Sequence, residues 1–181
     1  MTETPVVRTH LEMTRRDQLQ RAPMPPNARV ERVTACTVPF FRFLYKEVGD
    51  RYHWHDRLVW TDEQCRARFT APHVAIFAMY VDGTPAGYFE MERHTDESVE
   101  IMYFGLMPEF VGGGYGKAML SAAVEESWKF GAERVWLHTC TLDNPAALPN
   151  YLKRGFTPFK TEHYTVKLSP AAKATSAPPP A

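Results

Sequence analysis

The sequence has no excess of one charge and no organised set of cysteines. Its 181 residues include 21 Lys and Arg against 21 Asp and Glu, which gives a formal net charge of zero. No block of basic residues stands out, so we expect no electrostatic binding of nucleic acid. The three cysteines, Cys36, Cys65 and Cys140, lie far apart without CxxC spacing. This excludes a disulfide framework and indicates ordinary thiols in a reducing compartment.

Long apolar runs are also absent. No segment approaches the roughly 20 apolar residues that a membrane-spanning helix needs. The N-terminal segment MTETPVVRTH lacks the apolar core of a signal peptide. We therefore expect a cytoplasmic protein with no membrane partner. Apolar residues make up 44% of the chain, which is enough for the core of a single domain.

Proline clusters mark the two ends of the chain. After a predicted strand at 6–13, the segment RAPMPPN (21–27) forbids a regular helix and indicates an extended connector. The C-terminal segment SPAAKATSAPPPA is of low complexity. We therefore expect an N-terminal strand and connector at 1–26, one domain at 27–168 and a disordered tail at 169–181.

Between these ends the apolar pattern alternates between strand and helix periods. DGTP has the composition of a hairpin turn, Thr61 is suited to cap a helix, and Gly131 is suited to end one. This order predicts a mixed α/β sheet with one central crossover helix. Strands are predicted at 28–33, 73–81, 86–93, 98–107, 134–139 and 163–168, and helices at 38–49, at 61–69, from the glycine cluster to 131, and at 144–155.

The segment PEFVGGGYGKAML, at 108–120, places four glycines between a predicted strand and an amphipathic helix. A plain flexible turn is one interpretation. Two common phosphate motifs are excluded by their spacing: a P-loop needs Ser or Thr where Ala118 stands, and the dinucleotide fingerprint needs glycine at Lys117. A phosphate site is still favoured, because amides at a helix start are unpaired and glycines let ligand oxygens come close to the main chain.

Two blocks of the sequence resemble the GNAT superfamily of acyl-CoA-dependent N-acetyltransferases. VGGGYG, at 111–116, is similar to the family's Arg/Gln-x-x-Gly-x-Gly/Ala motif, except that Val111 replaces the first polar residue. NPAALPNYLKRGF, at 144–156, is similar to Asn-x-x-Ala-x-x-x-Tyr-x-x-x-Gly-Phe, with every anchor residue in place. The blocks occur in the family's order, and the resemblance covers about residues 28 to 168.

The resemblance implies a fold and an activity. The fold is a mixed, mostly antiparallel sheet, splayed between the fourth and fifth strands and flanked by about four helices. The activity is direct transfer of the acetyl group of acetyl-CoA to a primary amine of a small molecule or peptide. A non-catalytic acyl-CoA-binding module and a protein N-acetyltransferase are alternatives. A homodimer is compatible with the sequence, which gives neither the oligomeric state nor the identity of the acceptor.

For acetyl-CoA, the resemblance implies contacts made mostly by the main chain. The glycine loop would hold the pyrophosphate, and the Phe104 amide is the expected donor to the acetyl oxygen. The missing polar side chain at Val111 is expected to weaken binding without abolishing it. The expected cofactor-binding residues are Phe104, Leu106, Val111, Gly112, Gly113, Gly114, Tyr115, Gly116, Lys117 and Asn144.

Two residues are expected to transfer protons. Glu100 lies within a predicted strand, where glutamate is disfavoured, and matches the position of a general base in many relatives. About 13 Å of extended strand separates it from Phe104, so a base there needs a relaying water. A salt-bridged glutamate on the sheet face is the alternative. Tyr151 is the expected general acid toward the CoA thiolate, since a phenol stays protonated at neutral pH, and a packed aromatic residue is the alternative.

The acceptor amine is expected near the segment DRYHWHDRLVW, at 50–60. Trp54 or Tyr52 offers a ring on which a planar or cationic acceptor stacks, and Asp56 offers a partner for an ammonium group. A loop held together by its own aromatic residues is the alternative.

His138 is a further candidate for the acceptor cavity or for an alternative base, with a satisfied core histidine as the favoured alternative. His53 and His55 lack a further cluster of ligands, so no metal site is expected.

Overall fold

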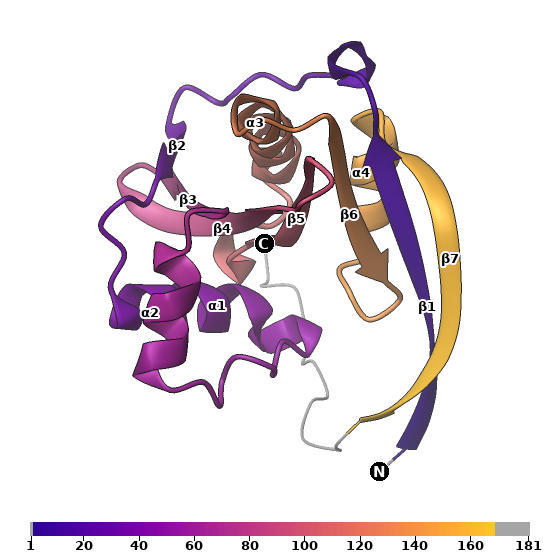
Figure 1. The fold of residues 1–181 in the computed structure, drawn as a ribbon, viewed down its shortest axis with the longest axis horizontal. Helices are drawn as coiled ribbons and strands as arrows, with labels where there is room; N and C mark the ends of the chain where they lie inside the picture. Colours follow the sequence, from indigo (N-terminus) through magenta and orange to yellow (C-terminus); the bar gives the residue numbers. More distant parts are fainter. Residues whose placement is uncertain (1, 169–181) are drawn as a thin grey trace, which may run out of the picture.

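The computed structural model describes residues 2–168, which form a seven-stranded sheet with helices on both faces (Figure 1). The strands are β1 (Thr2–Met13), β2 (Ala28–Arg32), β3 (Val74–Val81), β4 (Thr84–Arg93), β5 (Ser98–Leu106), β6 (Arg134–Cys140) and β7 (Thr157–Leu168). The helices are α1 (Val38–Gly49), α2 (Asp62–Thr70), α3 (Tyr115–Lys129) and α4 (Ala147–Lys153), with short 3-10 helices η1 (Arg16–Gln18), η2 (Asp50–Tyr52) and η3 (Pro108–Phe110). The tail that was expected to be disordered, 169–181, lies outside the described residues.

The strand order is β2-β3-β4-β5-β6-β1-β7, and all neighbours are antiparallel except β5 and β6. These two central strands are parallel and pair only from Ser98–Arg134 to Glu100–Trp136. Beyond Glu100 the strands separate, and α3 provides the crossover between them. The predicted mixed and splayed sheet is therefore confirmed.

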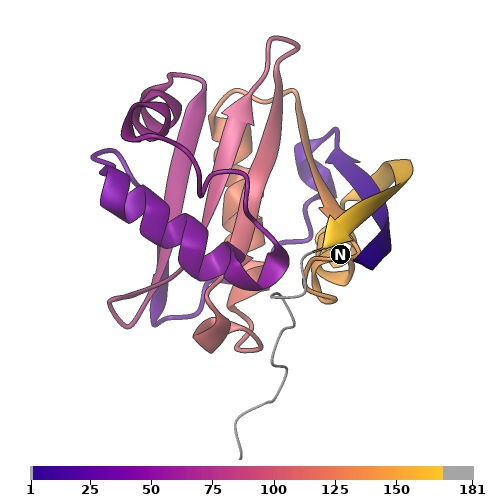
Figure 2. The ribbon, with the colours of Figure 1, turned by 90° about the horizontal axis from the view of Figure 1, so that it is seen from below.

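The half of the sheet made of β2 to β5 is covered on both faces. Figures 1 and 2 show α3 on one face and α1 with α2 on the other. Helix α3 buries its predicted apolar face, which includes Leu120 and Val124. Helix α1 places Phe41 and Leu44 in a second core with Tyr88 of β4. Strands between two cores are buried on both sides, which explains the continuous apolar run VAIFAMYV of β3.

Local sequence signals set several helix ends. The Thr61 hydroxyl accepts a hydrogen bond from the Gln64 amide, and the Thr61 amide donates to Gln64 Oε1 in return, which makes a reciprocal capping box at the start of α2. Gly131 follows α3 with a φ of +93°, a conformation that glycine adopts without strain. The predicted cap at Thr61 and the predicted stop at Gly131 are confirmed.

Strand β1 lies inside the sheet, between β6 and β7. It pairs with β6 from Arg8 to Met13 and with β7 along nearly its whole length. Leu11 and Met13 are fully buried. The connector that follows β1 packs on α3, where the Ala22 amide donates to Ser121 Oγ at 2.9 Å. The N-terminal segment therefore completes the sheet beside β6.

Helix α4 begins later than the sequence predicts. A helix capped by Asn144 was expected, whereas α4 starts at Ala147 and has no side-chain cap. The Asn144 side chain instead accepts from the Ala146 amide at 2.9 Å, in a turn that precedes the helix. Pro149 explains the delay, because a residue without an N–H is tolerated only in the first turn, where that donor has no helical acceptor. The predicted cap at Asn144 is wrong.

Candidate active site

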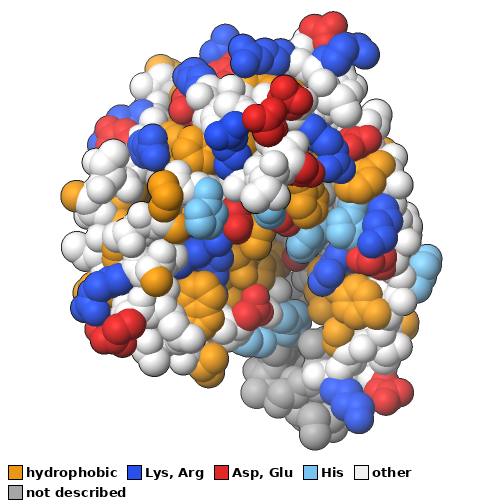
Figure 3. Space-filling model, in the orientation of Figure 1, with side chains coloured by type: hydrophobic (Ala, Val, Ile, Leu, Met, Phe, Trp, Pro, Cys, Tyr) orange, Lys and Arg blue, Asp and Glu red, His pale blue; other side chains and the backbone are white. Residues whose placement is uncertain are grey.

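A cleft of about 800 Å³ opens where β5 and β6 separate. Its walls come from the second half of β5, the glycine loop before α3, the end of β6, the residues around the start of α4, the segment after α1, and strands β1 and β7. Figure 3 shows the hollow, with histidine side chains gathered along it. Glu100, Gly113 and Tyr115 do not line the cleft. The other predicted site residues do, namely Tyr52, Trp54, Asp56, Phe104, Leu106, Val111, Gly112, Gly114, Gly116, Lys117, His138, Asn144 and Tyr151.

Two amides of β5 face the gap between the separated strands. The amide of Met107 donates to the carbonyl of Ala86, on the β4 side, at 2.8 Å. Since successive amides of a strand point to opposite edges, those of Leu106 and Phe104 point away from β4. Within residues 2–168, no strand pairs with this part of β5 on that side. The two amides are therefore available to a ligand that lies along β5 as an added strand would.

The glycine loop exposes main chain at the start of α3. Gly112 and Gly114 have φ values of +93° and +81°, and Gly114 directly precedes the helix. A Cβ at Gly112 would meet no described atom within 4 Å, so its open side faces free space. Lys117 in the first helical turn and the helix dipole both favour a negative group at this position. The loop therefore has the shape and charge to hold a diphosphate.

Gly113 and Tyr115 hold the loop from behind. A Cβ at Gly113 would lie 2.7 Å from the ring of Tyr115, so only glycine fits there. The Tyr115 hydroxyl accepts from Asn27 Nδ2 at 3.2 Å, and its ring packs edge-on against Phe110. Any contribution of these two residues to cofactor binding is thus limited to their main-chain groups.

Tyr151 lies at the cleft and is almost entirely buried. It is 5% exposed, and its ring centroid lies 6.1 Å from that of Phe104 and 6.2 Å from that of Phe156. Burial raises the pKa of Tyr151 above its ordinary value, and the negative charge of Asp143 adds to the shift. The phenol is therefore protonated at neutral pH and able to donate.

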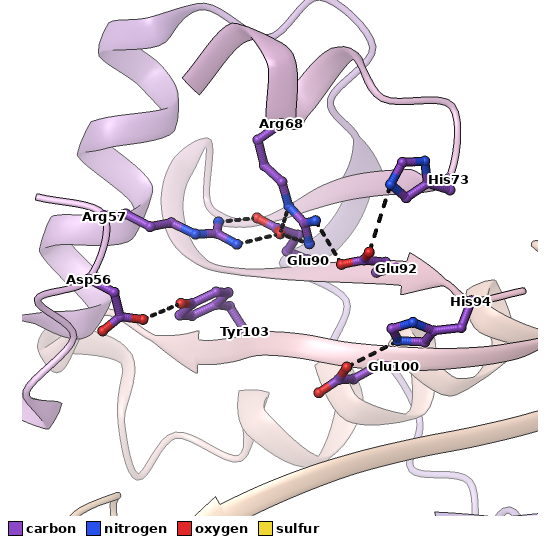
Figure 4. A network of polar contacts seen from close by, with 9 residues as sticks. All are labelled: Asp56, Arg57, Arg68, His73, Glu90, Glu92, His94, Glu100 and Tyr103. Carbon is purple, nitrogen blue, oxygen red and sulfur yellow. Dashed lines mark hydrogen bonds and ion pairs between the residues drawn. The ribbon is translucent and has the colours of Figure 1, made fainter. Parts of the chain in front are cut away.

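Glu100 lies at the point where β5 and β6 separate. It is 6% exposed, and its Oε2 lies 3.1 Å from His94 Nε2, as Figure 4 shows. Burial raises the pKa of Glu100 and outweighs the opposite influence of His94, while Glu92 raises it further. Because Glu100 does not line the cleft, a role as general base requires a relay.

His138 connects Glu100 with the cleft. It lines the cleft, and its Nε2 lies 3.9 Å from Glu100 Oε1. Burial lowers the pKa of His138 to about 4, and the positive charges of Arg8 and His10 add to the shift. The imidazole is therefore uncharged at neutral pH and only weakly basic, which suits a relay between the cleft and Glu100 better than a final proton acceptor.

The segment after α1 is fixed to both walls of the cleft. The Tyr52 hydroxyl accepts from Asn144 Nδ2 at 3.0 Å. The Tyr103 hydroxyl of β5 donates to Asp56 Oδ2 at 2.9 Å (Figure 4). The ring of Trp54 packs edge-on against that of Tyr103, with centroids 4.9 Å apart. The loop is thus held by its own aromatic residues and also borders the cleft.

Beneath this loop lies a buried ion cluster that the sequence did not predict. Arg57 donates twice to Glu90 of β4, at 2.5 and 2.7 Å, and Arg68 of α2 donates to the same carboxylate at 2.7 Å. Arg68 also contacts Glu92 at 2.7 Å (Figure 4). Glu90 is fully buried and Arg57 is 5% exposed. The one available signal is Glu90 inside the apolar run of β4, and it does not identify the partners.

Residues 2–168 contain neither a candidate metal cluster nor a helix able to span a membrane. No group of three or more His, Cys, Asp or Glu side chains in this range is placed to hold a metal ion. None of its helices has the length and apolar character needed to cross a bilayer.

Solved structures with the same fold include several acetyltransferases. A GCN5-related N-acetyltransferase from Kribbella flavida matches with a TM-score of 0.67 over 94% of this chain and 62% of its own, at 16% identity. An aminoglycoside acetyltransferase from an uncultured soil metagenomic sample matches with a TM-score of 0.65 over 79% of this chain and 97% of its own, at 15% identity. At these identities the likeness shows the fold alone.

Relatives found by sequence carry acetyltransferase names. Mycothiol acetyltransferase of Corynebacterium efficiens is 29% identical over 118 residues, which are 62% of this chain and 39% of that protein. An uncharacterized N-acetyltransferase of Mycobacterium bovis is 33% identical over 87 residues, which are 48% of this chain and 55% of that protein. The chain therefore spans about two fifths and just over half of the lengths of these relatives.

The profile of the Acetyltransferase (GNAT) family matches residues 38–156, from the start of α1 to the residue before β7. The matched range contains the glycine loop, the separated parts of β5 and β6, and Tyr151. Strands β1, β2 and β7 lie outside it. The chain belongs to the Acetyltransferase (GNAT) family.

Proposed function

We propose that this protein transfers the acetyl group of acetyl-CoA directly to a primary amine of a small molecule or peptide. The observation that carries the proposal is that the glycine loop and the unpaired amides of Phe104 and Leu106 open into one cleft, beside Tyr151. The glycine loop is suited to a diphosphate, the two amides are suited to pair with an extended arm that contains amide groups, and Tyr151 is suited to donate a proton. Membership of the family supports the same activity.

The main chain would bind most of the coenzyme. The glycine loop would hold the pyrophosphate with its amides, and Lys117 would add a positive charge. The Leu106 amide faces the gap in which the pantetheine arm would lie. Asn144 lines the same cleft but already donates to Tyr52, so it links the cofactor side with the acceptor side.

The chemistry requires an uncharged amine, a donor to the acyl oxygen and an acid for the departing sulfur. A bond forms between the amine nitrogen and the acyl carbon while the carbon–sulfur bond breaks. One proton leaves the nitrogen, and one reaches the sulfur. The Phe104 amide is the proposed donor to the oxygen, and Tyr151 is the proposed acid. Glu100 is the proposed base, and His138, 3.9 Å from its carboxylate and at the wall of the cleft, is the proposed relay of the amine proton.

The shape of the acceptor side favours a small molecule over a protein tail. Tyr52, Trp54 and Asp56 border it on one side, and Arg8 with Tyr164 border it on the other. One of the solved structures with this fold is an aminoglycoside acetyltransferase in complex with sisomicin. A small acceptor that is enclosed by side chains suits the bordered cleft.

Calorimetry with CoA and acetyl-CoA tests the cofactor side, and the release of free thiol in the presence of a panel of amines tests the transfer. We expect binding of both coenzymes and thiol release that depends on the amine. Folded protein that gives no heat with either coenzyme would refute the proposal. Binding without transfer to any amine would favour the second candidate, an acyl-CoA-binding module. Val111, 44% exposed where the family motif has Arg or Gln, is the observation that favours that candidate.

A further inference from the structure

We propose that the acceptor is an amino acid or a similar molecule, and that Arg8 of β1 binds its carboxylate. This inference rests on the proposed function, because it concerns the acceptor side of the same cleft. Arg8 lies outside the range 38–156 that the family profile matches, so the family motifs give no information about it. Its position follows from the register of β1.

The register of β1 turns Arg8 into the cleft. Residues opposite each other in antiparallel strands lie on the same face of the sheet. Arg8 is opposite Cys140 of β6, and His10 is opposite His138. Cys140, His138 and Arg8 all line the cleft. Leu11, which points to the other face, is fully buried in the core. The polar face of β1 is therefore the one that meets the acceptor.

The Arg8 guanidinium is only partly satisfied by the protein. It donates to the Tyr164 hydroxyl at 3.2 Å and lies 5.1 Å from the centroid of that ring. Its Nη1 is 4.0 Å from Glu162, at the outer limit of an ion pair. Its Nε is buried and has no hydrogen-bond partner among residues 2–168. This Nε has no contact with solvent, so a ligand in the cleft could not reach it, but the side chain as a whole is 37% exposed and lines the cleft. The terminal Nη groups are therefore the donors that a ligand can meet.

Glu162 interacts more closely with other groups than with Arg8. Its carboxylate lies 2.6 Å from Lys160 Nζ and 2.8 Å from His10 Nε2. Hydrogen bonds from Lys160 and His10 lower the pKa of Glu162 to about 2, so it is ionised and already paired with the charge of Lys160. Arg8 therefore keeps its positive charge available to the cleft.

A carboxylate matches this site better than a phosphate. The guanidinium fork matches a planar carboxylate with two parallel hydrogen bonds, and the Tyr164 hydroxyl lies beside it. Apart from Arg8, the only Lys or Arg that lines the described cleft is Lys117, at the glycine loop. A dianionic group would also meet the negative charges of Asp56 and Asp143.

Arg8 and His138 are near neighbours on the same face of the sheet. His138 is the diagonal neighbour of Arg8 across the β1–β6 pair, since Arg8 is opposite Cys140. Diagonal neighbours have Cα atoms roughly 7–8 Å apart. Both side chains line the cleft, so one molecule that carries a carboxylate and an amine can contact the two.

Matched acceptors test the proposal. The substrates are a series of amino acids in which the separation of amine and carboxylate increases. For each one, kcat/KM is measured at saturating acetyl-CoA and compared with kcat/KM for the matching carboxamide and the matching phosphonate. We expect the wild-type protein to prefer the carboxylate to the carboxamide by roughly 10- to 100-fold, the size of a charged hydrogen bond. Arg8→Gln should lower kcat/KM for carboxylates by a similar factor and leave carboxamides and CoA binding unchanged. Arg8→Lys should give an intermediate loss.

Three results would overturn the proposal: no preference for carboxylate in the wild type, an equal loss for carboxylate and carboxamide in Arg8→Gln, or a preference for phosphonate. Arg29→Gln, on the opposite edge strand β2, is the control and should resemble the wild type. Thermal unfolding verifies that each variant is folded. If Arg8→Gln is not folded, the comparison of carboxylate with carboxamide is made with Arg8→Lys.

Failure of the proposed function is a separate result, recognised by the absence of transfer to any acceptor, whether or not CoA binds. Calorimetry with N-acetylated amino acids, on the CoA-loaded protein if CoA binds and on the free protein if it does not, then decides the role of Arg8. Weaker binding to Arg8→Gln than to wild type supports the proposal, and equal binding refutes it.

Discussion

The two sides of the cleft are built from different kinds of groups. The proposed cofactor side consists mainly of main chain, namely the glycine loop and the outward amides of Phe104 and Leu106. The proposed acceptor side consists of side chains such as Trp54, Asp56 and Arg8, which come from segments far apart in the sequence. A main-chain site restricts the sequence only where glycine is required. A side-chain site depends on which residues the register and the loops bring together. One cofactor site can thus be combined with many acceptor sites.

The two sides also differ in how they are held in place. The glycine loop is supported by packing, with the ring of Tyr115 behind Gly113. The acceptor loop is supported by charge, through the buried contact of Arg57 with Glu90. We therefore expect substitutions on the two sides to separate cofactor binding from acceptor binding and stability.

The largest effect is expected from Glu90→Gln. This change leaves the guanidinium groups of Arg57 and Arg68 buried without their shared carboxylate, which should lower the free energy of unfolding by about 3–5 kcal/mol. Denaturant unfolding measures the loss. Glu31→Gln is the control, because it removes an exposed partner of Arg29 and should cost less than about 1 kcal/mol. Similar losses in the two variants would show that the buried cluster does not support the acceptor loop.

Tyr151→Phe tests whether the cofactor side contains a side chain with a chemical role. Loss of a general acid should lower kcat by about 100-fold, while the ring packing and the affinity for CoA are retained. Single-turnover kinetics and calorimetry measure the two quantities. Tyr80→Phe, on β3 outside the cleft, should turn over like the wild type. An unaltered kcat in Tyr151→Phe would reduce Tyr151 to a packing residue.

Gly112→Ala tests the main-chain site itself. The φ of +93° disfavours any side chain by about 1–2 kcal/mol, and the added Cβ would enter the open space proposed for the diphosphate. We expect CoA to bind about 10-fold more weakly, by calorimetry. Gly83→Ala is a matched control, with a φ of +85° and no described atom within 4 Å, in the hairpin turn between β3 and β4. Weaker CoA binding in both variants would point to backbone strain alone.

The smallest effect is expected from His138, which lies on the acceptor side. Burial lowers its pKa from 6.5 to about 4. Between pH 6.5 and pH 4, His138 therefore binds a proton in the unfolded chain but not in the folded protein. The stabilisation is therefore complete above about pH 6.5 and is lost as the pH falls toward 4. The side chain is 36% exposed, so solvent screening keeps the change below about 1 kcal/mol.

His138→Gln should flatten the pH dependence of the unfolding free energy between pH 6.5 and 4. His163→Gln, exposed on β7, should leave that dependence as in the wild type. If the slope is the same in His138→Gln and the wild type, His138 is not buried in its uncharged form.

The sequence predicted the bounds of a helix or strand well where a single local signal sets them. The apolar spacing of α1 gave its bounds at Val38 and Gly49, and the glycine cluster marked the start of α3. The start of α4 was misplaced, because two signals in one short segment, Asn144 and Pro149, compete. Strand β7 begins at Thr157 in place of 163, because its first residues are stabilised by pairing with β1, a partner distant in the sequence.

The sequence by itself indicated the glycine loop, because glycines between a predicted strand and a predicted helix are a local pattern. It indicated the splayed sheet and the position of Tyr151 through the resemblance of two blocks to the GNAT family. The tertiary structure alone decided that Arg57 meets Glu90 and that Arg8 faces the cleft. The reason is physical. A charged residue within an apolar strand predicts that a partner exists, but strand register and the path of the loops decide which residue that partner is. Both of these depend on the burial of apolar residues throughout the chain.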